Sequence, residues 1–200
     1  RKLLSRLFRL GFPIGLNFFL YSALFSTVAL MMGLFGTEVI AAHQIVLNFS
    51  GLIFMLPLGL GMSLTICVGQ SVGRNDPDSA SRVGFTGIFL CLFVSIISAS
   101  FTWFFAEEII AFYTKNIEIS AVAIQLLKIA VFLQVGDALQ TAAAFSLRGI
   151  KDTRIPMMLN GVNYWLVGFC TAYIVGIGFG FGPAGIWFGI TLALCIAGLV

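Results

Sequence analysis

Asp137 is a carboxylate in the middle of a long apolar stretch, and it is the residue in this sequence best suited to chemistry. Gln134 and Gln140 flank it at three-residue spacing, and Gln134 shares its helix face. An aspartate at the centre of a membrane-spanning helix costs roughly 2.5–3.5 kcal/mol. A carboxylate retained at that cost marks a path for an ion, a proton or a substrate, so these residues favour a transporter.

Two interpretations of Asp137 stay open from the sequence. In the functional one, its carboxylate is a binding site for a cation or a proton on a transport path. In the structural one, it accepts a hydrogen bond from a neighbouring helix. Gln134 and Gln140 either line a polar cavity around it or hold helices together. We expect no cofactor.

Other polar residues lie on the preceding apolar stretches. Asn17 and Tyr21 are four residues apart and therefore share a helix face, and Gln44 and Asn48 lie near one end of the next stretch. A polar face on a membrane-spanning helix should point toward protein. These four residues are candidates for cavity lining, with plain helix packing as the alternative.

No group of residues suits an enzyme. The sequence has no HExxH or GxSxG motif, and no two carboxylates fall close together within one apolar stretch. Metalloprotease and serine-hydrolase chemistry depend on those motifs. We therefore expect a transporter and not an enzyme.

The composition predicts an all-α integral membrane protein. The mean hydropathy is +1.06, with 60% hydrophobic and 10% charged residues, and the net charge is +3. The basic residues sit in short connections, so the partner is the lipid bilayer and not nucleic acid. Because one span takes about 20 apolar residues, this length holds about six. The expected spans are 8–35, 38–72, 84–106, 120–148, 154–178 and 183–200.

The basic residues also predict the orientation. Nine of the eleven precede the first span or follow the second or fourth. These nine are Arg1, Lys2, Arg6, Arg9, Arg74, Arg82, Arg148, Lys151 and Arg154. The positive-inside rule makes that side cytoplasmic, so the amino terminus of this chain is expected in the cytoplasm. We further expect Pro57 to bend the long second span and residues 107–118 to form a short interfacial helix.

Several stretches resemble the multidrug and toxic compound extrusion (MATE) family, in its bacterial NorM-like branch. They are 41–45 continuing through Asn48, Pro57 and Gly69 to 73–76, then 136–140, 147–149 and 152–154, and finally 164–165 and 185–189. Together they cover nearly the whole chain in the order of that family.

This resemblance implies that residues 1–200 are the carboxyl-terminal six-helix lobe of a twelve-helix antiporter in the bacterial inner membrane. Two such lobes flank a central cavity in the family and export organic cations and drugs, in exchange for Na⁺ or H⁺. The acidic residue of the tenth helix falls on Asp137, so the resemblance implies that Asp137 binds the coupling ion, H⁺ or Na⁺. With Na⁺ it would be a metal ligand, and no cofactor besides this ion is implied. The remaining partner is the amino-terminal lobe of the same chain.

Two positions depart from the family pattern. A glutamate of many NorM-like members falls on Tyr21, which carries no negative charge at neutral pH, so a site with two carboxylates is in doubt and protons are slightly favoured. A proline of the fifth span falls on Cys170. The alternatives are a lipid-linked oligosaccharide flippase of the related superfamily, whose cavity should be rich in basic residues, and a membrane subunit that transports nothing.

Overall fold

The computed structural model describes residues 2–199, with the side chains of residue 4 and residues 7–199. Arg1 of the predicted topology and the end of the sixth span at residue 200 lie outside the described residues, and the side chains of Lys2 and Arg6 lie outside the described side chains. Every element between residues 2 and 199 is helical. The elements are α1 (Lys2–Gly33), α2 (Thr37–Gly73), α3 (Pro77–Phe104), α4 (Ala106–Tyr113), α5 (Ile117–Gly149), α6 (Arg154–Val162), η1 (Asn163–Phe169), α7 (Cys170–Tyr173), η2 (Ile174–Gly178) and α8 (Gly182–Leu199).

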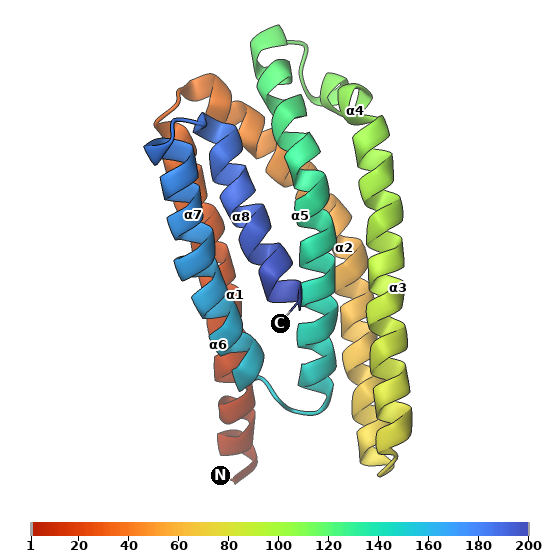
Figure 1. The fold of residues 1–200 in the computed structure, drawn as a ribbon. Coiled ribbons are helices and arrows are strands. Elements are labelled where there is room, and N and C mark those ends of the chain that lie inside the picture. Colours follow the sequence, from red (N-terminus) through yellow and green to blue (C-terminus); the bar gives the residue numbers. More distant parts are fainter. Residues whose placement is uncertain (1, 200) are drawn as a thin grey trace.

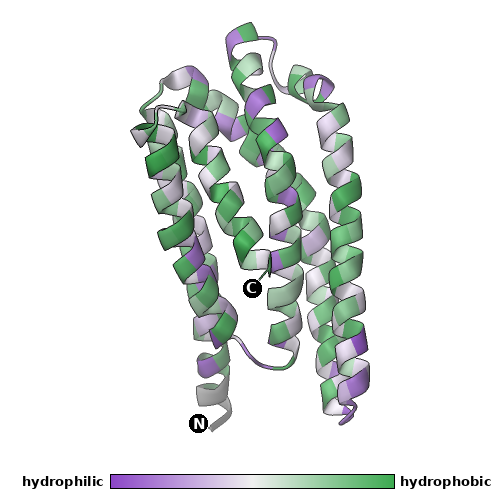
Figure 2. Cartoon of the chain, viewed as in Figure 1, coloured by the Kyte–Doolittle hydropathy of each residue, from purple (hydrophilic) through white to green (hydrophobic). Residues whose placement is uncertain are grey.

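Six helical runs of the described chain are long and apolar enough to cross a membrane, which confirms the predicted all-α membrane fold. Large apolar side chains such as Phe85, Phe104 and Phe112 are exposed, as expected of a surface that faces lipid. Figure 2 shows hydrophobic residues along the length of the helices and many of the hydrophilic ones at the turns. The turns α2–α3 and α5–α6 lie at the same end of the bundle as the start of α1 (Figure 1).

The largest difference from the expected spans is at the start of the third helix. The third helix begins at Pro77 rather than at residue 84, because Asp76 caps it by accepting a hydrogen bond from the Ser79 backbone N–H at 2.9 Å. Pro at the first helical position is a normal start signal. The predicted interfacial helix is present as α4, which ends at Tyr113, and α5 begins at Ile117 after a short break.

Helix α2 is too long to cross a membrane upright. Its 37 residues would extend about 55 Å, against a hydrocarbon core of about 30 Å. Figure 1 shows its first half crossing obliquely behind α5 and its second half running beside α3. Pro57 lies inside this helix, where its ring removes one backbone donor and permits the change of direction.

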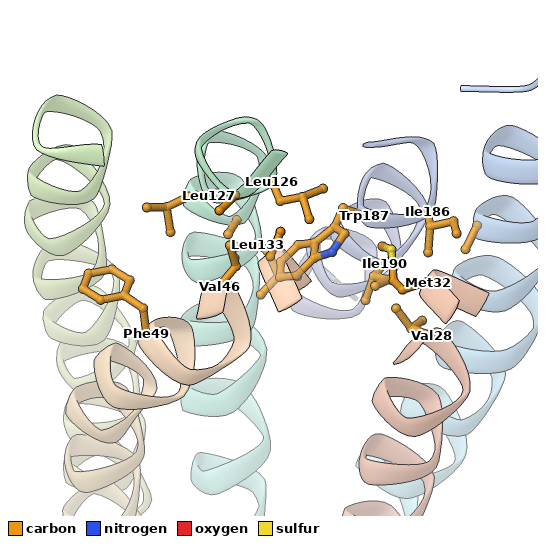
Figure 3. Packing of buried hydrophobic residues seen from close by; sticks show 14 of the residues in the cluster. Val28, Met32, Val46, Phe49, Leu126, Leu127, Leu133, Ile186, Trp187 and Ile190 are labelled. Carbon is orange, nitrogen blue, oxygen red and sulfur yellow. The ribbon is translucent and has the colours of Figure 1, made fainter. Parts of the chain in front are cut away.

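The core lies around α5, which packs against α2, α3 and α8. Trp187 and His43 are both fully buried in it, and the indole N–H of Trp187 donates a hydrogen bond to Nδ1 of His43 at 3.2 Å. Figure 3 shows the Trp187 ring between Leu133 of α5 and Ile190 of α8. The lone histidine therefore holds a tryptophan in place between two spans.

The fifth span contains two π-helical segments, η1 and η2, which the sequence did not predict. Cys170 lies between them, at the position where the family pattern expects a proline, and its thiol lies 3.7 Å from the Trp165 carbonyl five residues before it. The α-helical turn between the two segments, α7, packs closely on α8. A Cβ placed on Gly189 would lie 2.3 Å from the backbone nitrogen of Ala172.

Replacing Gly189 with alanine is expected to lower the stability of the protein by about 1–3 kcal/mol, because the added methyl group overpacks a contact with backbone. The measurement is the melting temperature of the full-length protein in detergent. Gly178→Ala is the matched control, since a Cβ there meets nothing within 4 Å. Equal melting temperatures for the two variants would contradict the close packing of α8 on the fifth span.

Candidate functional site

Helix α5 places Asp137 inside the bundle, with 4% of the residue exposed. The preceding residue, Gly136, faces α8, where a Cβ would lie 2.9 Å from the backbone nitrogen of Cys195. On α8, Gly198 is equally close to α5, since its Cβ would lie 3.0 Å from the Gly136 carbonyl oxygen. Small residues let these two backbones approach. This contact fixes how α5 is shifted along its axis and rotated about it relative to α8, and so where Asp137 lies.

Asp137 accepts a hydrogen bond from the hydroxyl of Tyr21 on α1, at 3.1 Å between Oη and Oδ2. The donor is neutral, so this contact leaves the negative charge of an ionised Asp137 without compensation. A buried charge without an opposite charge is costly. The pair is therefore suited to binding a cation or a proton.

A second polar pair lies next to the first. The amide of Gln140 donates a hydrogen bond to the hydroxyl of Tyr164 in η1. The rings of Tyr21 and Tyr164 meet edge to face, with centroids 5.8 Å apart. Asp137, Tyr21, Tyr164 and Gln140 thus form one polar cluster that joins α1, α5 and the fifth span.

Asn17 extends the polar contacts toward the α5–α6 turn. Its Oδ1 accepts a hydrogen bond from Nδ2 of Asn160 on α6 at 3.2 Å, and both residues are buried. This contact joins the first and fifth spans. Asn17 also lines a cavity, so the two interpretations left open by the sequence both apply to it.

Two cavities meet at Asp137. The upper cavity, on the side of Trp187, has a volume of about 300 Å³, and the lower cavity, on the side of Arg148, about 90 Å³. Tyr21, Phe54 and Asp137 line both of them. The upper cavity is further lined by Phe25, Leu47, Ser50, Gly51, Ile53, Pro57, Ser95, Ser98, Leu133, Gln134 and Trp187. The lower cavity is further lined by Asn17, Phe18, Leu58, Gln140, Thr141, Ala144, Phe145, Arg148, Asn160 and Tyr164.

Gln44 and Asn48 do not join this site. Both are exposed on α2 and line neither cavity, because the helix turns His43 and Ser50 inward instead. The side chain of Asn48 accepts a hydrogen bond from Tyr113 at 3.1 Å. Contrary to the prediction, these two residues therefore do not line either cavity of this lobe.

Arg148 reaches the site from the end of α5. Its guanidinium carbon lies 4.3 Å from the ring centroid of Phe145 and 5.4 Å from that of Phe18, and the side chain lines the lower cavity. Contacts of this kind hold a cation against aromatic faces. Arg148 thus lies at the lower cavity, whereas Arg154 is exposed.

Phe54 and Tyr164 are site residues that were not expected from the sequence. Tyr164 had a usable signal, since a tyrosine in a membrane span needs a partner for its hydroxyl. Phe54 had none, because nothing in the sequence distinguishes it among the 21 phenylalanines.

The oxygen atoms around Asp137 would suit a hard cation. The Tyr21 hydroxyl contacts its carboxylate, and the side-chain carbonyls of Gln134 and Gln140, one in each cavity that Asp137 lines, accept no hydrogen bond from the described residues. Within residues 2–199, no three His, Cys, Asp or Glu side chains gather into a metal site. A bound Na⁺ would therefore combine one carboxylate with neutral oxygens.

Comparisons with known proteins give the family. The MatE family model matches residues 13–174. The multidrug resistance protein NorM of Photobacterium profundum is 38% identical over 203 residues, which cover 100% of this chain and 44% of that protein. The multidrug resistance protein NorM of Vibrio cholerae serotype O1 is 39% identical over 204 residues, covering 100% and 45%. The chain thus spans less than half the length of these relatives.

Solved structures share the fold. The eukaryotic MATE transporter AtDTX14 superposes with a TM-score of 0.92 at 21% identity, over 98% of this chain and 44% of that one. An outward-facing multidrug resistance MATE family transporter of the MOP superfamily gives 0.90 at 18% identity, over 97% and 43%. Since the family model covers most of the sequence and the expected resemblance is confirmed, this chain belongs to the MatE family of membrane transporters.

Proposed function

We propose that this chain is the carboxyl-terminal lobe of a cation-coupled efflux antiporter that exports organic cations and drugs. One observation carries the proposal: Asp137 is a buried carboxylate on a membrane-spanning helix, it lines two cavities, and its hydrogen-bond partner is a neutral hydroxyl. The names of the relatives, multidrug resistance proteins, support the class of substrate.

Coupling follows from competition for one negative charge. An ionised Asp137 attracts an organic cation into the cavity, and the aromatic rings of Phe25, Phe54 and Trp187 provide faces for its flat apolar part. Binding of the coupling ion at Asp137 neutralises the charge and releases the substrate. Export of the substrate then depends on import of the coupling ion, because the two cations cannot both be bound.

The proposed coupling ion is H⁺. Asp137 has a tyrosine as its partner where many NorM-like members have a glutamate, and a single carboxylate can be neutralised by one proton. Na⁺ is the alternative, and it would take up the neutral oxygens of Gln134 and Gln140 described above.

The proposed location is the bacterial inner membrane, with the α2–α3 and α5–α6 turns in the cytoplasm. Arg74 and Lys151 lie in these turns, and Arg9 lies near the start of α1 at the same end of the bundle. Basic residues on short connections remain on the cytoplasmic side.

Efflux by the full-length parent protein should follow a pH gradient. In proteoliposomes with an acidic interior, ethidium is expected to accumulate inside against its own concentration gradient, and nigericin should abolish this by collapsing the pH difference. A Na⁺ gradient at equal pH should give no accumulation. Accumulation under Na⁺ alone would replace H⁺ with Na⁺, and none under either gradient would refute the antiporter.

A further inference from the structure

The upper cavity contains polar groups that the coupling mechanism leaves unused. Gln134 and Ser50 line it and are 7% and 9% exposed. Neither the amide nitrogen and oxygen of Gln134 nor the hydroxyl of Ser50 makes a hydrogen bond with the described part of the chain. The cavity therefore offers donors and acceptors on both α5 and α2.

Such groups are exceptional in a buried position. The large majority of buried side-chain polar atoms in proteins have a partner, and leaving one unpaired costs about 1–3 kcal/mol. The other serines of this cavity follow the rule, because Ser95 and Ser98 donate to the backbone carbonyls of Leu92 and Ser95, each at 2.9 Å. Gln134 and Ser50 are thus free to bind something that enters the cavity.

The walls of the upper cavity indicate which kind of molecule can bind there. Tyr21 and Phe54 stack nearly parallel, with ring centroids 6.4 Å apart and planes 22° from parallel, and Trp187 is held in the wall by His43. A volume of about 300 Å³ is at the lower limit of small-molecule pockets, which are mostly apolar with a few placed polar groups. It suits one fused aromatic ring system.

We infer that the upper cavity is a subsite for the aromatic part of a substrate, in which Gln134 and Ser50 select ring systems that carry a hydrogen-bonding substituent. The inference rests on the proposed function and deepens it. Asp137 supplies attraction to any organic cation, whereas Gln134 and Ser50 distinguish one cation from another by an amino, hydroxyl or carbonyl group on the ring.

The test measures binding of two matched dyes to the purified full-length protein in detergent, without any gradient. One is 3,6-diamino-10-methylacridinium, and the other is 10-methylacridinium, which has the same charge and rings but no amino groups. Gln134→Leu is expected to raise the Kd of the diamino dye about three- to tenfold, the effect of one lost hydrogen bond, and to leave the Kd of the plain dye unchanged. Ser50→Ala should act in the same direction.

Ser71→Ala is the matched control. Ser71 is also a buried serine on α2, but its hydroxyl donates to the Cys67 carbonyl at 3.1 Å and it lines neither cavity, so both Kd values should stay as in the wild type. The melting temperature checks folding, and Gln134→Leu should not lower it, because it removes an unpaired buried amide.

The difference between the dyes separates this inference from the proposed function. Asp137→Asn should raise the Kd of both dyes by the same factor, since it removes only charge. Unchanged Kd values in this variant would contradict the proposed role of Asp137 in attracting the cation, but not the subsite. Equal loss of both dyes in Gln134→Leu, or no loss of either, would overturn the subsite and leave a water-filled cavity.

Discussion

Asparagine in place of Asp137 is expected to abolish gradient-driven efflux by the full-length protein and to leave its fold intact. Asparagine has nearly the same shape, and its side-chain oxygen can accept the hydrogen bond that Tyr21 donates to Asp137. It carries no charge and binds no proton near neutral pH, so it can neither attract the substrate cation nor exchange it for the coupling ion. Ethidium accumulation in proteoliposomes with an acidic interior should fall to the level of liposomes without protein.

Two further variants separate coupling from stability. Asp137→Glu keeps the charge on a side chain that is one methylene group longer, and it should retain part of the efflux. Asp76→Asn makes the same chemical change at the α3 N-cap, where asparagine caps as well as aspartate, so transport and melting temperature should both persist. Full efflux by a folded Asp137→Asn protein would move coupling to the other lobe and make Asp137 a structural residue.

Much of the fold could be predicted because the bilayer restricts it so strongly. Long apolar runs must be helices, and a carboxylate within one of them must be buried in protein. Both rules place Asp137 inside a helical bundle from the sequence alone. The start of α3 also has a signal, since Asp76 followed by Pro77 is typical of a helix start, although the apolar run that predicts the span begins only at residue 84.

The contacts between spans could not be predicted in the same way. Tyr21 and Asp137 are 116 residues apart in the chain, and no periodicity gives the rotation of one helix against another. Spacing indicates which residues share a face but not where that face points, so Gln44 and Asn48 are expected in the cavity and are in fact exposed. The two π-helical segments of the fifth span, which pack against α8, have no signal in composition or motif.

Glutamate in place of Tyr21 is expected to give the lobe a stronger response to Na⁺ than the wild type has, because it adds a second carboxylate close to Asp137. Tyr21 lies 3.1 Å from Asp137, and a glutamate on the same face of α1 is shorter, so its carboxylate would stop short of Asp137 and leave room for an ion. Two close carboxylates cannot both remain ionised without a cation between them. Na⁺ should then raise the melting temperature of the variant in a concentration-dependent way, as a ligand that binds only the folded state does.

Two uncharged variants show whether the new charge is responsible. Tyr21→Gln matches the shape of glutamate without its charge, and Tyr21→Phe keeps the ring and removes the hydroxyl, so neither should respond to Na⁺ more than the wild type does. Choline chloride at equal ionic strength controls for screening. If wild type and Tyr21→Glu show the same Na⁺ response, the tyrosine does not set the choice of ion. If only Tyr21→Glu responds, one substitution at the partner of Asp137 separates proton from sodium coupling, which places ion selectivity in this pair of residues.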